Sequence, residues 1–218
     1  MSNSIQAVIW DLDGVILDSA EEHRQAWHRL AREEGVPFTD ADFWTTFGKR
    51  NNDIFAAIWN RPLSPEEVQA LADRKEAYFR ELIRKSAAFL PGAMELMRGL
   101  HEVGFRQALA SSTPMVNIAL MSDVLGLKRF LDVFVSGESV AHGKPAPDLF
   151  LKAASELGIE PSRCLVIEDA VAGVEAAHAA GMHCIAVACN RDLPGLRKAD
   201  LMVKSLTEVD VERIRQLA

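Results

Sequence analysis

Short apolar runs alternate with longer amphipathic segments through most of the chain. Runs rich in Val, Ile, Leu and Ala lie at 5–10, 106–110, 133–135, 165–167 and 184–188, and such runs are typical of buried parallel strands. The segments between them place apolar residues every three or four positions, which predicts helices. The alternation therefore predicts a Rossmann-like α/β core, a doubly wound parallel sheet with helices on both faces. We expect these helices at 92–102, 116–125, 148–157, 171–180 and 211–217, and an edge strand at 201–203.

A long and wholly helical stretch interrupts the alternation directly after the first strand. Its length far exceeds that of an ordinary crossover between parallel strands. We therefore expect a small helical cap domain at residues 20–90, inserted into a core made of residues 1–19 and 91–218. The cap helices are expected at 20–34, from residue 40, at 51–59 and at 64–85.

Polar residues mark the starts of two of these cap helices. Asp18 and Ser19 are suitable N-caps for the helix at 20–34. Ser64 precedes a proline and two glutamates, which is a strong start signal for the helix at 64–85. An aromatic group is expected in the core of the cap rather than as a stacking platform: Phe43, Trp44 and Phe47.

Composition limits the kinds of partner that the chain can have. The 218 residues are 49% hydrophobic and 25% charged, which is ordinary for a soluble globular protein. A net charge of −7 argues against nucleic acid or an anionic membrane surface as a partner. No apolar run approaches the ~20 residues that are needed to span a bilayer. We expect a monomer or a weak dimer that acts on a small molecule.

Cysteine and histidine usage gives no sign of a zinc site. The three cysteines, Cys164, Cys184 and Cys189, lack metal-ligand spacing, and the six histidines include no i, i+4 pair. The first two cysteines begin apolar runs and are expected to pack in the core. An odd number of cysteines and the absence of a basic segment before the first strand indicate a cytoplasmic protein without a signal peptide.

Two carboxylates follow the first predicted strand. Asp11 and Asp13 stand where that strand meets a glycine turn, and ligands bind at this end of the strands in open α/β sheets. Two carboxylates in a dry site are costly unless a cation or a proton lies between them. A capped turn with solvated aspartates would also explain the pair, so the pair alone does not decide its role.

Three further polar groups lie beyond other predicted strands. They are Ser111, Lys144 in the sequence GKPAPD, and the acidic pair Glu168 and Asp169. Two carboxylates, a hydroxyl, a lysine and an acidic pair together suit phosphoryl transfer. The set resembles the haloacid dehalogenase superfamily, in its aspartate-nucleophile phosphatase and phosphomutase branch. All four motifs occur in the order and spacing of that family, and the resemblance covers essentially the whole chain.

The resemblance implies a role for each of the two aspartates and for a metal ion. Asp11 would be the nucleophile that forms an aspartyl-phosphate. Asp13 would be the general acid for the leaving oxygen and the base for water, with its backbone carbonyl on the metal. Asp169 would hold Mg²⁺ beside Asp11, and Glu168 would contact the metal through water. A second metal carboxylate is the alternative role for Asp13.

The resemblance also implies contacts to the transferred phosphoryl group. Ser111 would donate a hydrogen bond to it, helped by backbone amides around Gly14, and Ser112 is a further candidate contact. Lys144 would neutralise the phosphate and the nucleophile together. By itself Ser111 could be a plain helix cap. A solvated surface role for Lys144 fits less well, because two prolines make its loop rigid.

The first cap helix resembles that of β-phosphoglucomutase and related sugar-phosphate phosphatases. The resemblance rests on residues 18–23, DSAEEH, followed by Ala26 and Trp27. It places His23 at a hinge that senses cap closure, and it matches Lys75 to a cap lysine that communicates with the site. An ordinary histidine on an amphipathic helix fits His23 equally well.

The cap loop at 48–52, GKRNN, is the candidate substrate-reading loop. Its Lys49 and Arg50 suit an anionic ligand, although exposed cations of this kind are commonly only solvated. The mutase arginine in this loop aligns with Asn51, and its lysine and asparagine after the motif serine align with Pro114 and Met115. Those mutase residues hold the second phosphate of a bisphosphate, so their absence favours a phosphatase over a mutase.

Other members of the superfamily fit less well. A dehalogenase would lack Asp13, and a phosphonatase would carry a lysine in the first cap helix, where this chain has none before Lys49. A catalytically inactive binding protein is the alternative from another class. We therefore expect a Mg²⁺-dependent phosphatase acting on a small phosphate ester, with a phosphomutase as the alternative enzyme.

Overall fold

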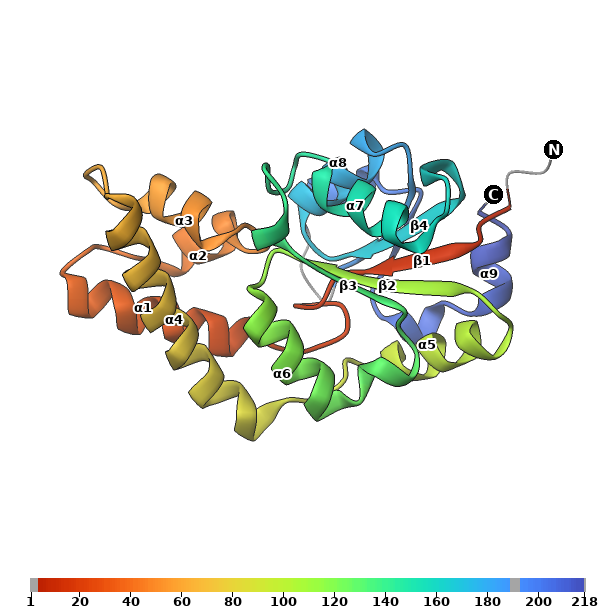
Figure 1. Ribbon diagram of the computed structural model, residues 1–218, viewed down its shortest axis with the longest axis horizontal. Coiled ribbons are helices and arrows are strands. Elements are labelled where there is room, and N and C mark those ends of the chain that lie inside the picture. Colours follow the sequence, from red (N-terminus) through yellow and green to blue (C-terminus); the bar gives the residue numbers. More distant parts are fainter. Residues whose placement is uncertain (1–3, 189–192, 218) are drawn as a thin grey trace.

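A computed structural model describes residues 4–188 and 193–217 (Figure 1). In this part of the chain six parallel strands form one sheet in the order β3-β2-β1-β4-β5-β6. The direction of winding reverses between β1 and β4, which is the switch point of a doubly wound sheet. The predicted fold class is therefore confirmed. The strands are β1 (Ala7–Trp10), β2 (Arg106–Ser111), β3 (Val133–Ser136), β4 (Cys164–Glu168), β5 (His183–Val187) and β6 (Leu201–Val203).

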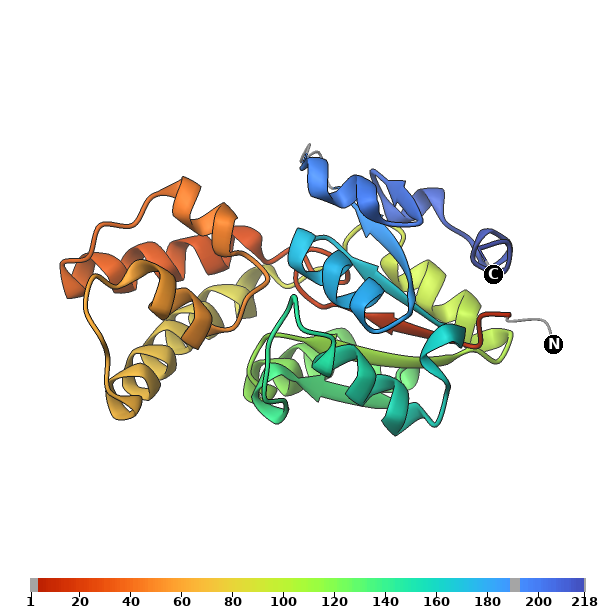
Figure 2. The same cartoon turned by 90° about the horizontal axis from the view of Figure 1, so that it is seen from above.

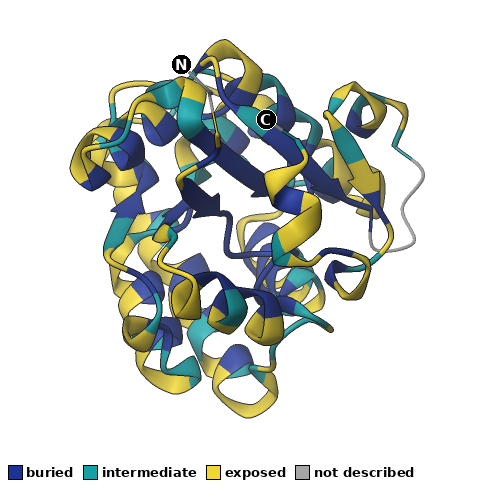
Figure 3. Ribbon diagram, turned by 90° about the vertical axis from the view of Figure 1, so that its right-hand side faces the viewer, coloured by how far each residue is buried: buried dark blue, intermediate teal, exposed yellow. Residues whose placement is uncertain are grey.

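Helices cover both faces of the sheet, and the strands are buried between them (Figure 3). Along β1, Ala7 and Ile9 belong to the apolar cluster under α7 and α8, whereas Val8 and Trp10 belong to the cluster under α5, α6 and α9. This division follows from the two-residue period of a strand. The core helices are α5 (Ala93–Glu102), α6 (Met115–Leu125), α7 (Asp148–Leu157), α8 (Val171–Ala179) and α9 (Val211–Arg215).

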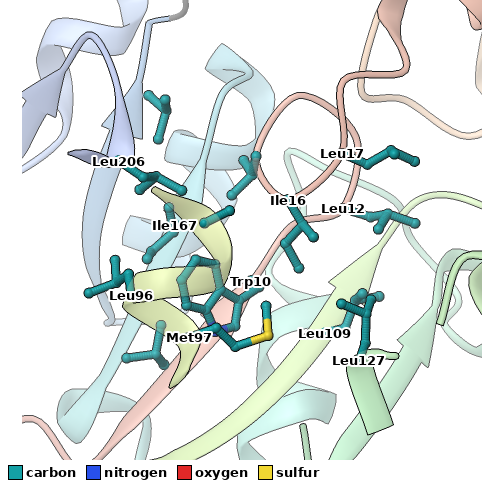
Figure 4. Close-up of a cluster of buried hydrophobic side chains, with 14 of the residues drawn as sticks. Trp10, Leu12, Ile16, Leu17, Leu96, Met97, Leu109, Leu127, Ile167 and Leu206 are labelled. Atoms are coloured by element: carbon teal, nitrogen blue, oxygen red, sulfur yellow. The ribbon is translucent and has the colours of Figure 1, made fainter. Parts of the chain in front are cut away.

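Trp10 anchors the end of the central strand from which the first motif emerges. Its ring lies among Leu96, Met97 and Ile167 (Figure 4). The indole Nε1 donates to the side-chain oxygen of Gln107 at 3.0 Å, and the Gln107 amide donates to the carbonyl of Met97 at 2.9 Å. A large buried ring with a satisfied polar atom fixes the position of β1 and so of the residue after it.

The helices between β1 and α5 stand apart from the sheet at one end of the molecule (Figures 1 and 2). They pack around their own apolar cluster, which includes Trp27, Phe55 and Leu71. Phe79 and Ile83, near the end of the last of them, join the core cluster instead. We propose that residues 20–90 form the cap domain on these grounds. Its helices are α1 (Ala20–Glu34), α2 (Asp40–Thr46), α3 (Asn51–Ile58) and α4 (Pro65–Ser86).

Two local predictions about the cap were wrong and one was confirmed. Ser19 is the N-cap residue of α1, but its side chain makes no capping hydrogen bond, and Asp18 makes none either. Trp44 is 43% exposed although Phe43 is 2% exposed, because adjacent residues point about 100° apart on a helix and cannot share one face. Ser64 does cap α4, in a capping box with Glu67.

The predicted positions of the helices and strands and the predicted burial of two cysteines agree closely with the structure. Cys164 and Cys184 are buried in the core, and Cys189 lies outside the described residues. Ends of elements differ from the predicted ranges by a few residues. Across 4–188 and 193–217, each helix is too short or too polar to cross a membrane.

Candidate active site

The motif residues gather at the carboxyl edge of the sheet, beside the switch point. Asp11 directly follows β1, Ser111 ends β2 and Glu168 ends β4. Because β1 pairs with both β2 and β4, the ends of these strands are neighbours. Lys144 lies in the loop between β3 and α7, and its peptide bond to Pro145 is cis.

Lys144 lies between two carboxylates. Its Nζ is 2.6 Å from Asp11 Oδ1 and also donates a short hydrogen bond to Glu168 Oε1. The other Glu168 oxygen accepts from the backbone N–H groups of Asp169 and Ala170, each at 2.7 Å. With both of its oxygens engaged, Glu168 holds Lys144 and the turn into α8. A contact of Glu168 to the metal through water stays a prediction.

Negative charge is concentrated around Asp11. Burial raises the pKa of Asp11 well above its ordinary value; Lys144 opposes this rise, while Glu168, Asp169 and Asp13 add to it. Burial opposes the charge of Lys144, but Asp11 and Glu168 together raise the pKa of Lys144 above its ordinary value. One buried lysine thus faces several carboxylates, and a further cation would relieve their repulsion.

Asp13 is surrounded by hydrogen-bond donors. Ser19 Oγ donates to Oδ1 at 2.6 Å, Thr113 Oγ1 donates to Oδ2 at 2.7 Å, and His23 Nε2 lies 3.3 Å from Oδ1. Burial would raise the pKa of Asp13, but His23 and the two hydroxyl donors lower it below its ordinary value. The carboxylate is therefore ionised, which is the form that a general base requires.

A chain of buried polar contacts connects Asp13 to the cap. His23 stacks on Phe79 with 3.8 Å between ring centroids, and its Nδ1 lies 2.8 Å from Lys75 Nζ. Lys75 in turn donates to Glu76 Oε1 at 2.8 Å. The structure therefore brings His23 and Lys75 together beside the site.

These groups line an enclosed pocket between the cap and the edge of the sheet. It leaves about 40 Å³ for the centres of water-sized molecules, which is room for a few waters but not for a sugar phosphate. We therefore expect the cap to move when a ligand binds. Its polar lining comprises Asp11, Asp13, Ser111, Ser112 and Thr113 from the core, and His23, Thr46, Lys49, Asn51, Lys75 and Glu76 from the cap.

Gly14 allows a carboxylate to approach the loop after β1. Its φ is 82°, and a Cβ atom at this position would overlap the carboxylate of Asp169. Side chains other than glycine rarely adopt such a φ. Gly14 is therefore required for Asp169 to lie beside the residues of the first motif.

The candidate residues of the cap loop are divided between the pocket and the cap–core contact. Lys49 and Asn51 line the pocket, whereas Arg50 is not part of its lining. Arg50 Nη1 donates to the carbonyls of Val140 and Ala141 at 3.3 and 3.2 Å. Arg50 thus connects the cap to a loop of the core and is placed away from the expected substrate contact.

Ser112 makes a second cap–core contact. Its hydroxyl lines the pocket and donates to the carbonyl of Gly48 at 2.8 Å. Polar residues at or near the pocket that were not predicted as site residues include Ser19, Thr46, Thr113 and Glu76. Thr113 stands two positions after Ser111, and this spacing is the one signal in the sequence that could have indicated it.

The donor set fits a hard divalent cation. Carboxylates of Asp11 and Asp169 and the carbonyl of Asp13 would hold it, and oxygen ligands suit Mg²⁺ rather than zinc. Within 4–188 and 193–217, no three His, Cys, Asp or Glu side chains are gathered as a ready metal cluster. Mg²⁺ commonly needs only one or two carboxylates, completed by waters and a substrate phosphate.

The sequence profile of the haloacid dehalogenase-like hydrolases matches residues 5–181. The chain belongs to this family. It is 32% identical to validoxylamine A 7′-phosphate phosphatase of Streptomyces hygroscopicus subsp. limoneus, over 94% of this chain and 95% of the relative. It is also 32% identical to β-phosphoglucomutase of Bacillus subtilis, over 97% and 95%. Two other relatives are longer proteins, of which the chain covers 18% and 57%.

A solved member of the family has the same architecture. β-Phosphoglucomutase of Clostridium difficile superimposes with a TM-score of 0.90 at 29% identity, covering 98% of this chain and 96% of that one. The predicted membership of the family, with phosphatase and β-phosphoglucomutase relatives, is therefore confirmed. The chain is an enzyme of the phosphatase and phosphomutase kind within this family.

Proposed function

We propose that the protein is a Mg²⁺-dependent phosphatase that hydrolyses a small phosphorylated metabolite, a sugar phosphate, through an aspartyl-phosphate on Asp11. The observation that carries this proposal is the buried contact of Lys144 with Asp11, which lines a small pocket together with Asp13. Relatives named for phosphorylated carbohydrates, such as the Escherichia coli hexitol phosphatase A at 31% identity, support the substrate class.

The reaction follows from the positions of the two aspartates. A carboxylate oxygen of Asp11 attacks phosphorus, the bond to the sugar oxygen breaks, and that oxygen takes a proton from Asp13. Water then attacks the phosphorus of the aspartyl-phosphate, giving its proton to Asp13 and releasing inorganic phosphate and free Asp11. The ionised Asp13 of this structure suits the second step, and it needs a proton before the first.

The remaining site residues bind and neutralise charge. Lys144 contacts Asp11 and so would also offset the charge of a bound phosphate. Ser111 lines the pocket, and its hydroxyl would donate to a phosphoryl oxygen. Mg²⁺, held by Asp11, Asp169 and the Asp13 carbonyl, would supply further neutralisation of the phosphate charge.

A phosphomutase is the second candidate, because two β-phosphoglucomutases cover nearly the whole chain. A mutase must hold a second phosphate and keep water from the aspartyl-phosphate. Pro114 lines the pocket where the mutase has a lysine, and Arg50 bonds to core carbonyls and Asp53 instead. Both features support hydrolysis over transfer.

One set of reactions tests the nucleophile. Wild type should release phosphate from a chromogenic phosphate ester with Mg²⁺, and chelation should abolish this activity. Asp11→Asn should lower kcat by several orders of magnitude with the fold intact, whereas Asp123→Asn, an exposed aspartate paired with Lys128, should behave as wild type. Near-normal activity of pure Asp11→Asn would refute the assignment.

A second reaction separates phosphatase from mutase. The protein is incubated with β-glucose 1-phosphate, Mg²⁺ and a trace of β-glucose 1,6-bisphosphate. Steady release of inorganic phosphate, with no need for the bisphosphate, is expected. Rapid formation of glucose 6-phosphate with little free phosphate would identify a mutase.

A further inference from the structure

Glu76 is a buried carboxylate that the proposed reaction does not use. It lies on α4, is 4% exposed and forms part of the cap lining of the pocket. The reacting groups, Asp11 and Asp13, line the same pocket from the core. Glu76 therefore faces the space that the non-phosphate end of a substrate would occupy.

Three donors surround Glu76 and keep it ionised. Lys75 Nζ and Asn51 Nδ2 donate to Oε1 at 2.8 and 2.9 Å, and Asn117 Nδ2 donates to Oε2 at 2.6 Å. Burial would raise the pKa of Glu76, but the charges of Lys75 and His23 lower it below its ordinary value. A carboxylate can accept about four hydrogen bonds, so one acceptor position is left.

The ion pair with Glu76 also reduces the positive charge that Lys75 presents to a ligand. Because Lys75 contacts Glu76 directly, the two charges largely cancel at that wall of the pocket. Arg50 is turned to core carbonyls, and Arg80 donates to Asn117 at 2.9 Å. Lys49 is the other cation of the lining. The cap wall at Glu76 is therefore rich in acceptors rather than in donors for a second anion.

We propose that Glu76 determines specificity by accepting a hydrogen bond from the substrate end remote from the phosphate. It would select a monophosphate with a hydroxyl or ammonium group there over one with a carboxylate or a second phosphate. This inference rests on the proposed phosphatase function. A carboxylate or phosphate of the substrate would meet an acceptor there and leave that acceptor without a donor, whereas an O–H or N–H donor fills the remaining acceptor position.

A matched set of three sugar phosphates tests the inference. Glucose 1-phosphate, 6-amino-6-deoxyglucose 1-phosphate and glucuronic acid 1-phosphate differ only at C6, which carries a hydroxyl, an ammonium or a carboxylate. For wild type, kcat/KM for the first two should exceed that for the carboxylate by about tenfold or more, since two acceptors placed side by side leave both without a donor. A preference for the carboxylate, or equal values, would overturn the inference.

Glu76→Gln keeps the shape of the side chain and removes its charge. It should reduce the discrimination against the carboxylate, measured as the ratio of kcat/KM values, about tenfold. The control is Glu81→Gln, at an exposed position of the same helix paired with Arg29, which should keep the wild-type ratio. An unchanged ratio in folded Glu76→Gln would also overturn the inference. Should that variant not fold, the kcat/KM values of wild type for the three sugar phosphates decide by themselves.

Failure of the proposed function has a different signature. Wild type would then release no phosphate from any of the three compounds or from the chromogenic ester. Calorimetric binding of the three compounds to wild type with Mg²⁺ still tests the role of Glu76. Weaker binding of the carboxylate supports it, and equal binding, no binding or a preference for the carboxylate overturns it.

Discussion

Asp13 takes its charge state from residues outside its own motif. Thr113, which is 100 positions away, and Ser19 donate to its two oxygens, while His23 lies beside it from the cap. Each donor favours the carboxylate over the neutral acid. The pKa of Asp13 is lowered, so its contribution to stability is complete above the pKa of an unfolded aspartate and is lost as the pH falls through the lowered value.

Thr113→Val removes one of these donors and should raise the pKa of Asp13. The acid limb of the pH profile of kcat should then move to higher pH, and folding should lose about 1–3 kcal/mol, because a buried hydrogen bond to a charged group is lost. Rates from pH 8 down to the lowest pH at which the protein stays folded, and denaturant unfolding, measure the two effects. The control is Thr45→Val, since Thr45 is exposed and bonds only to the Ala41 carbonyl. An unshifted acid limb in a folded Thr113→Val protein would contradict the role.

At the scale of elements, the turn from β4 into α8 fixes the lysine of the site. Glu168 ends the strand, accepts two N–H groups of the turn and holds Lys144. Gly173 lies in the first turn of α8, and a Cβ atom there would overlap the Glu168 carboxyl group. The helix can approach the strand this closely only because this residue has no side chain.

Gly173→Ala should therefore displace Glu168 and, with it, Lys144. We expect kcat to fall about tenfold or more and stability to fall by about 1–3 kcal/mol, as for other overpacked sites. Gly99→Ala in α5 is the matched control, because its new Cβ would make only an ordinary contact with Val211, 3.5 Å away. Alanine favours helix over glycine, so Gly99→Ala should leave kcat unchanged and stability equal or higher. Equal behaviour of the two variants in thermal melts and assays would disprove this account.

At the scale of the whole molecule, the cap covers the site. It contacts the core both within the pocket and beside it. Arg50 bonds to the carbonyls of Val140 and Ala141, and its side chain packs closely against Gly137 and Gly143. The pocket is too small for a sugar phosphate in this arrangement. The Arg50 contacts therefore stabilise a closed form that has to open and close again around substrate.

Arg50→Gln should weaken this closed form. Because only the closed form brings cap and core groups to the substrate together, kcat/KM should fall about threefold to tenfold. Hydrogen exchange in the loop at 48–50 should become faster. Arg61→Gln, at an exposed cap position paired with Glu67, should change neither measurement. If Arg50→Gln retains both wild-type values, the contact does not control closure.

The sequence by itself determined the class of fold and the members of the first motif set. Strand and helix periods differ, so apolar spacing identified the core strands. Glycines and helix-capping residues marked many of the helix ends. Parallel strands bring their carboxyl ends to one edge, which is why residues far apart such as Asp11, Ser111 and Glu168 could be expected together. The family resemblance rests on that same set of residues and was confirmed by the comparisons.

Only the tertiary structure decided which partner each polar side chain has. Ser19 has the sequence context of a helix cap but donates to Asp13, and Arg50 bonds to core carbonyls instead of lining the pocket. Glu76 lies on a helix of ordinary amphipathic pattern, and its burial depends on Asn51 and Asn117 from two other helices. The physical reason is that burial and hydrogen bonding depend on distances set by packing between elements, whereas local periodicity reports only which face of one element is apolar.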